Sequence, residues 1–352
     1  MKEKVITPLN LLMVAVTLVG IVLANGRAYA AEGIYTDNSV SYYEDGQGVT
    51  YGFNDDGTSC YVKGFTDNIV ANVVIPEKIT MNDKQYTVTV IGEKAFYWCE
   101  VLKTIELPDS ITSIKRKAFW SSGLTELTIP KNVTELVDTS INCCVNLPYV
   151  TIAEDNPMYS ADGQGCVYNK DKTVLIFALG MVDEVIIPKT VKTIGEYAFY
   201  DTQLTKVTIP NSVKKIEDSA FGLCTNLKTL LIPNSVKTIE GWAFGGCDKL
   251  TKIKIGKNVT TIGKYAFENC FQLKSIIIQS TKLKSIGEGA FSKDKNLKSV
   301  TIKTTKLTKT KVGANAFKGT NKKLVIKVPK NKVNSYKKFL KTKGNKKVIV
   351  SN

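Results

Sequence analysis

Apolar residues recur along this chain with a long, regular period. When the chain is aligned on the dipeptide Ala-Phe, neighbouring copies lie 22 to 26 residues apart. A period in the twenties is typical of a solenoid, in which each repeat is one coil and adjacent coils share a core. The pattern predicts about nine coils of ~23 residues. The aligned phenylalanines are Phe96, Phe119, Phe199, Phe221, Phe244, Phe267, Phe291 and Phe317.

Two shorter patterns lie inside each unit. Leu227, Leu230 and Ile232 follow the spacing L-x-x-L-x-L, in which the last two apolar residues alternate as in a half-buried strand. Stacked units therefore predict a mainly β structure with a parallel sheet on one face and short 3-10 or helical turns elsewhere. The Ala-Phe pair is expected to turn the chain, and the glycine of pairs such as Ile262-Gly263 is expected to supply a positive φ.

The repeat is interrupted once. Residues 133–152 keep the apolar positions, with Ile141 in place of the phenylalanine. Residues 153–180 form an insertion with turn-forming residues at Asp162-Gly163 and at 169–172. Strand-like apolar runs lie beside them over 166–168 and 174–177. These features predict a β-hairpin that protrudes from the stack.

The two ends differ from the coils. Lys2 and Lys4 precede an apolar run over 11–24, and a small-x-small pattern ends at Ala30, which is the layout of an export signal. The run of 14 residues is shorter than the roughly 20 that span a bilayer, and a retained membrane anchor is the alternative. Residues 333–340 are expected to be helical. The predicted layout is a signal peptide over 1–30, an N-terminal β cap over 31–75, coils over 76–152, the insertion over 153–180, coils over 181–328 and a Lys-rich C-terminal cap over 329–352.

The repeated motif Ile-Pro-x-Ser-Val-x-x-Ile-Gly-x-x-Ala-Phe-x-x-Cys-x-x-Leu-x-x-Ile, found around residues 191–270, resembles the BspA-like class of bacterial leucine-rich repeats. The resemblance covers residues 72–330. The insertion is also similar to a variant common in that class, in its Asn156-Pro157-x-Tyr159 pattern. The resemblance implies a leucine-rich-repeat solenoid that is exported and serves in adhesion to extracellular-matrix proteins or to other cells. It implies no catalytic residues.

Three positions depart from the motif of that class. Ile141 replaces the phenylalanine, and Asp294 and Thr320 stand where cysteine is expected. These departures weaken single coils and leave the predicted fold unchanged.

Charge is distributed unevenly along the chain. The formal net charge is +16, and residues 281–352 hold 21 lysines against Glu288 and Asp294. In an exported protein this basic segment suits an anionic cell-wall polymer, lipid headgroups or an acidic glycan, and nucleic acid is not an expected partner. The alternative is a lysine-rich surface that only keeps the protein soluble.

The residues that usually carry catalysis are scarce. The chain has no histidine, which removes Ser-His-Asp and Cys-His catalysis and the commonest metal ligand. Carboxylate pairs such as Asp55-Asp56 lie in turn-like contexts. Five cysteines occupy the position three residues after the Phe position and are expected to be small buried groups, and no C-x-x-C spacing supports zinc. They are Cys99, Cys144, Cys224, Cys247 and Cys270, and the others, which the sequence cannot pair, are Cys60, Cys143 and Cys166. We therefore expect no enzyme, no metal and no cofactor.

The outward positions of the repeated strands are the candidate binding residues. In a solenoid this face is broad, rigid and repeated. Ile186, Leu231 and Ile277 are expected to be isolated exposed apolar points on alternate coils, and charge along the face changes from acidic to basic. The alternative is that Thr and Ile occur here because they suit strands. The candidates are Glu106, Tyr149, Ile186, Lys206, Leu231, Lys254, Ile277 and Thr301.

Two functional hypotheses follow. The first is a monomeric, secreted or cell-surface adhesin that binds a protein or glycan ligand, such as an extracellular-matrix protein, through the solenoid face. The second is a structural or wall-associated protein that its basic C-terminal third holds to an anionic polymer.

Overall fold

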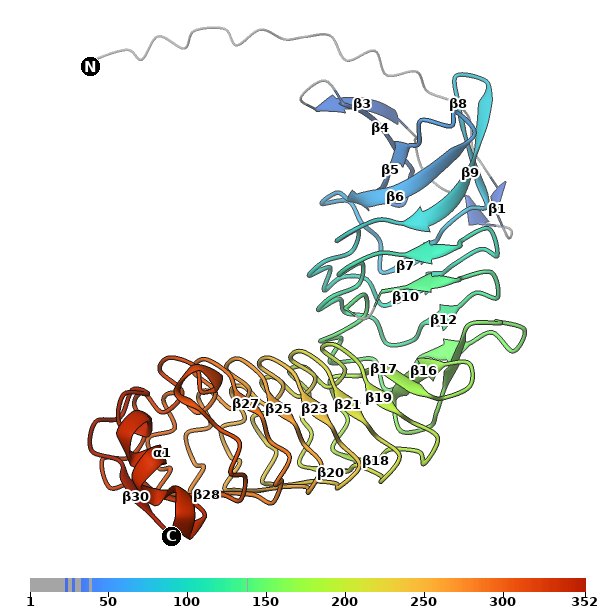
Figure 1. The fold of residues 1–352 in the computed structure, drawn as a ribbon. Helices are drawn as coiled ribbons and strands as arrows, with labels where there is room; N and C mark the ends of the chain where they lie inside the picture. The colour runs from blue at the N-terminus through green and yellow to red at the C-terminus, as the bar shows by residue number, and fades with distance from the viewer. Residues whose placement is uncertain (1–22, 25–26, 29–32, 38–39, 138) are drawn as a thin grey trace, which may run out of the picture.

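The computed structural model describes residues 23–24, 27–28, 33–37, 40–137 and 139–352, so the signal peptide predicted over 1–30 lies largely outside the described residues. The described chain is a β-solenoid of about eleven turns (Figure 1). The predicted fold class is thus confirmed, and the number of coils is slightly higher than predicted. The difference arises because strands from the predicted cap and insertion also join the parallel ladders of the coils.

One face of the solenoid carries the strands that the L-x-x-L-x-L pattern predicts. All of these strands pair in parallel with a neighbour, and the last six form one continuous sheet. They are β7 (Asn72–Val74), β10 (Thr104–Glu106), β12 (Thr128–Ile129), β14 (Thr151–Ile152), β18 (Glu184–Ile186), β20 (Lys206–Thr208), β22 (Thr229–Ile232), β24 (Lys252–Ile255), β26 (Ser275–Ile278), β28 (Ser299–Ile302), β29 (Val325–Lys327) and β30 (Ile349–Ser351). We call this surface the sheet face.

A second set of parallel strands lies on another side of the coils, in addition to the sheet that the sequence predicts. It belongs to two separate sheets, one before and one after residue 138, and we call the set the second sheet. It consists mainly of two-residue strands, which are too short to show any alternation in the sequence. Its members among the coils are β11 (Ser113–Ile114), β13 (Glu135–Leu136), β19 (Thr193–Ile194), β21 (Lys215–Ile216), β23 (Thr238–Ile239), β25 (Thr261–Ile262) and β27 (Ser285–Ile286).

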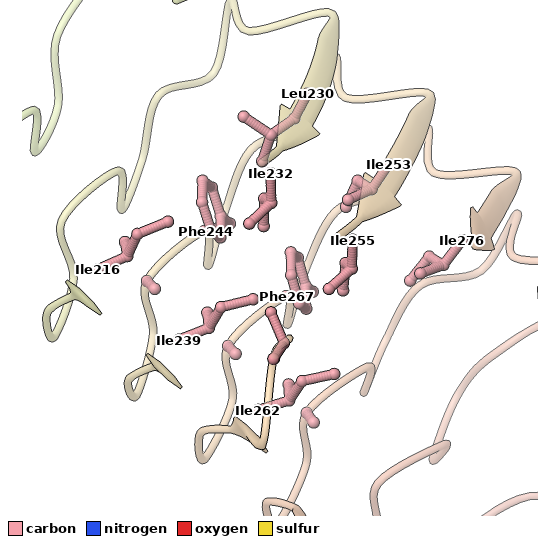
Figure 2. Packing of buried hydrophobic residues seen from close by; sticks show 14 of the residues in the cluster. Ile216, Leu230, Ile232, Ile239, Phe244, Ile253, Ile255, Ile262, Phe267 and Ile276 are labelled. Atoms are coloured by element: carbon pink, nitrogen blue, oxygen red, sulfur yellow. The ribbon is translucent and has the colours of Figure 1, made fainter. Parts of the chain in front are cut away.

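The repeated phenylalanines stack between the two sheets. From Phe199 to Phe317 consecutive rings lie 4.9 to 5.6 Å apart and are nearly parallel. Figure 2 shows Phe244 and Phe267 in this stack, with isoleucines of both sheets around them. Each ring is fully buried, so the stack forms the centre of the core.

The turn at Ala-Phe is held by bonds between coils. The N–H of Phe221 donates to the carbonyl of Ala243 at 2.8 Å, and the same bond recurs from coil to coil. Residues two before and two after the phenylalanine have positive φ, as at Trp242 (51°) and Asn269 (61°). The glycine of the Ile-Gly pairs does not supply the positive φ, contrary to the expectation. A Cβ at Gly263 would lie 2.3 Å from the carbonyl carbon of Glu240, so this glycine permits close contact between coils.

Both ends of the solenoid carry additional elements. The C-terminal coils end in η1 (Lys309–Lys311), η2 (Lys330–Lys332) and α1 (Val333–Leu340), and the helix spans the residues expected to be helical. The N-terminal strands are β1 (Leu23–Ala24), β2 (Arg27–Ala28), β3 (Gly33–Asp37), β4 (Val40–Glu44), β5 (Val49–Phe53), β6 (Ser59–Phe65), β8 (Lys78–Met81) and β9 (Lys84–Ile91). Antiparallel pairs connect β3 to β6 in order, and β6 then runs parallel to β9.

The insertion differs from the protruding hairpin that the sequence predicts. It forms three antiparallel strands, β15 (Tyr159–Ala161), β16 (Cys166–Asn169) and β17 (Val174–Ala178), and β17 continues in parallel into β19. Tyr168 and Leu175 belong to the apolar cluster of the following coils, whereas Val167 and Phe177 belong to that of the preceding coils. All four are buried, because the insertion is packed as a wedge between two stretches of solenoid.

The wedge coincides with a bend. Figure 1 shows two straight stretches of coils meeting at an angle, with β16 and β17 at the junction. We call residues 40–152 the N-terminal arm and residues 182–352 the C-terminal arm.

Candidate binding surfaces

The sheet face places the predicted binding residues in three groups. In the C-terminal arm Leu231, Lys254, Ile277 and Thr301 are direct neighbours on β22, β24, β26 and β28. The side chain of Leu231 is 60% exposed, whereas Ile277 and Thr301 are half-buried. Leu231 therefore fits the expectation of an exposed apolar point better than Ile277 does.

The second group lies next to the bend. Ile186 is on β18, is 68% exposed and is paired in register with Thr208 on β20. Lys206 is also on β20, but its Nζ lies 2.9 Å from Oε2 of Glu184. An exposed ion pair of this kind is weak, so the amine of Lys206 remains able to contact a ligand.

The third group lies in the N-terminal arm. Glu106 and Tyr149 line the same hollow of about 440 Å³, together with Glu126 and Thr128. The Tyr149 ring is 58% exposed. The sheet face is therefore acidic around this hollow, whereas Lys254 and its neighbours make it basic further along.

Sequence reasoning missed a second surface, formed by the turns around the phenylalanines. All three tryptophans of the chain, Trp98, Trp120 and Trp242, lie within two residues of a Phe position. Hollows of about 410 and 300 Å³ open on this side, one beside Trp98 and one beside Trp242. We call this side the turn face. The sequence signal for it was the occurrence of Trp and Tyr within two residues of several of the repeated phenylalanines.

The two arms touch through residues of the turn face. The rings of Trp120 and Tyr200 have centroids 6.1 Å apart, and Asn142 donates from Nδ2 to the carbonyl of Tyr197 at 3.2 Å. The thiol of Cys143 lies 3.8 Å from Asp201, and burial raises its pKa to about 12. The thiol is thus protonated at neutral pH and is a poor nucleophile.

The cysteines are structural, which confirms the prediction for the five on the repeat. All eight are free and those five are buried. Burial raises the pKa of Cys144 to about 11 and that of Cys224 to about 12, so both carry the proton that they donate to the carbonyl of the phenylalanine one coil earlier, at 2.9 Å.

Two further features bear on the chemistry of the surfaces. Among the residues that the structure describes, no group of three or more His, Cys, Asp or Glu side chains is arranged to hold a metal ion. No helix in the same part of the chain is long and apolar enough to cross a membrane.

The model of the BspA type leucine rich repeat region matches this chain in six copies, over residues 64–169, 176–240 and 223–343. The chain belongs to this family. The predicted resemblance is thereby confirmed. No curated protein sequence matches the chain.

Solved structures resemble this BspA-type protein in fold. A leucine rich cell surface protein from Faecalibacterium prausnitzii is 22% identical, with 76% of this chain and 94% of that chain covered and a TM-score of 0.53. A leucine-rich repeat protein from Eubacterium ventriosum is 20% identical, with 83% and 95% covered and a TM-score of 0.56. The pneumococcal vaccine antigen PcpA is 21% identical, with 91% and 99% covered and a TM-score of 0.55. At these identities the likeness concerns the fold alone.

Proposed function

We propose that this BspA-type protein is an exported binding protein, secreted or held at the cell surface, that recognises a protein or glycan of a host or cell surface through its sheet face. The observation that carries the proposal is the set of outward side chains held in register on paired strands. Such an array costs little conformational entropy on binding, because the strands are already ordered. The fold is typical of binding scaffolds, and we propose no enzymatic activity and a monomeric state.

Two other observations support the proposal. Exposed Tyr149, Ile186 and Leu231 are the kind of side chain that anchors protein interfaces when polar residues surround it. The first solved structure named above is described as a cell surface protein, and this property is consistent with the export signal expected in residues 1–30.

The test is a binding screen of the mature chain against extracellular-matrix proteins and surface glycans. The test variant carries Ile186→Thr and Leu231→Thr. Threonine is chosen because it already occupies the equivalent outward position on other strands of the sheet face, at Thr208 and Thr301. We expect at least about tenfold weaker binding, or ~1.4 kcal/mol, for the loss of two anchors.

The matched control lies on the turn face. Val101→Thr and Val145→Thr remove two exposed valines without touching the sheet face and should leave the affinity unchanged. Equal loss of binding in both double variants would contradict recognition through the sheet face, as would a screen in which no ligand binds above a repeat-scrambled chain.

A second candidate function has its own supporting observation. Of the 21 lysines in residues 281–352, Lys293 is the one that forms an ion pair with a carboxylate in the described part of the chain, at Glu268. We propose that the others are available to hold the protein on an anionic wall polymer. Moderate salt should then release the protein from cells, because exposed charges are screened beyond about 10 Å at 0.1 M. Retention of the protein in high salt would exclude this candidate.

A further inference from the structure

A strip of lysines without acidic partners runs along the C-terminal arm, and five of its seven lysines precede the basic segment over residues 281–352. It consists of the residues that precede five strands of the second sheet, β19, β21, β23, β25 and β27 (Figure 1). These segments hold seven lysines and no Asp or Glu. We call them the basic strip, and they are residues 189–192, 211–214, 234–237, 257–260 and 281–284.

The backbone holds the strip in register. The N–H of Lys214 donates to the carbonyl of Lys192 at 2.7 Å, and that of Lys237 donates to Lys214 at 2.8 Å. The same bonds continue through Thr260 to Lys284, each at 2.8 Å. Adjacent strands of a sheet lie about 4.8 Å apart, so these residues form a straight column with that repeat, in which Thr260 takes the place of one lysine.

The lysines of the strip have no counter-charge. All seven are exposed, and no carboxylate of the described residues forms an ion pair with any of them. The neighbouring Lys215, on β21 itself, does pair with Glu217 at 2.8 Å and Glu240 at 3.7 Å. Carboxylates are therefore within reach of these coils but are placed outside the strip.

The fold itself does not require lysine at these positions. In the N-terminal arm the same column holds Thr89, Thr112 and Thr134, joined by equivalent bonds of 2.8 and 2.9 Å. Threonine suits a strand better than lysine, and like charges opposite each other on adjacent strands are destabilising. The one lysine in the corresponding part of the N-terminal arm, Lys131, is neutralised by Asp109 at 2.8 Å.

We propose that the basic strip binds an acidic polysaccharide, a linear chain of uronic acid residues that lies along the solenoid axis. A row of unpaired positive charges is complementary to a row of carboxylates. The electrostatic potentials of the lysines add along the basic strip and attract a polyanion. The length of one sugar residue is similar to the spacing of adjacent strands, about 4.8 Å. An extended polyuronate therefore advances by about one residue per coil, and the carboxylates on one side of its chain face lysines of the strip.

Among the other side chains of the strip, one suits a sugar polymer. Asn234 and Asn258 use their side chains in bonds between coils, to Lys257 and Lys282 among others. The exposed Asn211 forms no side-chain hydrogen bond with another described residue, so it brings an amide donor and acceptor that suit sugar hydroxyls. The inference is independent of the proposed role of the sheet face.

The test compares two triple variants of the full mature chain with equal net charge. The strip variant carries Lys192→Thr, Lys214→Thr and Lys237→Thr. The control carries Lys63→Thr, Lys78→Thr and Lys84→Thr, at three exposed lysines of the N-terminal arm that form no ion pair with a carboxylate of the described residues. The probes are polygalacturonate, linear polyphosphate and uncharged dextran, and binding is measured by calorimetry at several salt concentrations.

We expect the wild-type protein to bind polygalacturonate and not dextran. The strip variant should bind at least about tenfold more weakly, and the slope of log K against log salt should fall by about two, at ~0.7 for each lost contact with a flexible polyanion. The control variant should change the affinity less than about threefold, through long-range attraction alone. The Ile186→Thr and Leu231→Thr variant should bind polygalacturonate normally.

A second measurement uses the wild-type protein and does not depend on the folding of a variant. Polygalacturonate should protect Lys192, Lys214 and Lys237 from acetylation more than it protects Lys63 and Lys78, as read by mass spectrometry. Equal weakening in the two triple variants would overturn the proposal, and so would uniform protection of all lysines. Tighter, strip-dependent binding of polyphosphate would assign the strip to a phosphate polymer instead.

Discussion

At the scale of single residues, the position three residues after each phenylalanine determines how adjacent coils join. Cys224, Cys247 and Cys270 each donate from Sγ to the carbonyl of the phenylalanine one coil earlier, at 2.9 to 3.2 Å. The sequence predicted that these thiols are buried. It could not predict their bonds, because the acceptor lies 25 or 26 residues away and becomes adjacent only through stacking.

Asp294 occupies this position in the next coil and is an exception. Its Oδ1 accepts the N–H of Cys270 at 2.9 Å, but its Oδ2 is buried and has no hydrogen-bond partner. Burial, with a smaller contribution from the charge of Glu268, raises the pKa of this carboxyl well above its usual range. Ionisation of Asp294 therefore opposes folding.

We predict that Asp294→Cys raises the free energy of unfolding at pH 7 by about 1–3 kcal/mol, because it removes an unpaired buried carboxyl group. The folded-state pKa of Asp294 is raised, so its stabilising protonated form is fully populated below the ordinary pKa of about 3.8 and is lost as the pH rises through the folded-state pKa. The advantage of the variant should thus grow from acid to neutral pH.

Urea unfolding at pH 3.5 and pH 7 measures this difference. The exposed Asp218 provides the control, and Asp218→Asn should change stability by less than about 0.5 kcal/mol at either pH. An advantage of Asp294→Cys that is the same at both pH values would show that the carboxyl group does not titrate in the way proposed.

At the scale of elements, the insertion was the part of the fold that the sequence described least well. Its turns and its strands β16 and β17 were recognisable, since Asp162-Gly163 before β16 and the polar residues 169–172 that lead from β16 to β17 are turn signals. The runs Cys166–Tyr168 and Val174–Phe177 are apolar at nearly every position, and the reason appears only in three dimensions. The insertion packs on both sides, and a bulge lies between Val167 and Tyr168. Neighbouring residues therefore contact the cores of different arms, and the sequence shows no alternation of buried and exposed positions.

We predict that Leu175→Ala and Phe177→Ala destabilise different arms. Leu175 contacts the core of the C-terminal arm and Phe177 that of the N-terminal arm, and each truncation should cost about 2–5 kcal/mol through a cavity. Hydrogen exchange should accelerate in β19, β21 and β23 for Leu175→Ala, and in β9, β11 and β13 for Phe177→Ala.

The half-buried Val174 gives the control for this pair, because Val174→Ala removes two methyl groups from the same strand with little cavity formation. If both core variants accelerate exchange equally in both arms, the insertion is not a boundary between two cores but part of one cooperative unit.

At the scale of the whole molecule, a solenoid must close its ends. The repeat predicted this need but not how it is met, since the caps share no pattern with the coils. The C-terminal end is closed by α1 and β30, whose Tyr336, Leu340 and Val350 are buried. The hydroxyl of Tyr336 accepts the N–H of Leu307 and donates to the carbonyl of Thr304, both at 3.0 Å. The sequence did not predict the bend between the arms either. The arms meet there through contacts such as that of Trp120 with Tyr200, which lie on opposite sides of the insertion in the sequence.

Removal of residues 333–352 should convert the protein from a monomer into a dimer or larger species. The deletion uncovers β29, which pairs in parallel with β30, and an unpaired strand edge beside exposed core residues is a site for pairing between chains. In the intact chain the last edge is short and follows Lys346 and Lys347, which discourage such pairing. Light scattering after size exclusion measures the mass.

Tyr336→Phe separates the two effects of the cap, which are stabilisation of the fold and protection of the strand edge. The variant removes the two hydroxyl bonds and should lower the free energy of unfolding by about 1–3 kcal/mol, while β30 still covers the edge of β29. A truncated chain that stays monomeric and equally stable would show that the coils before it close the core without the cap.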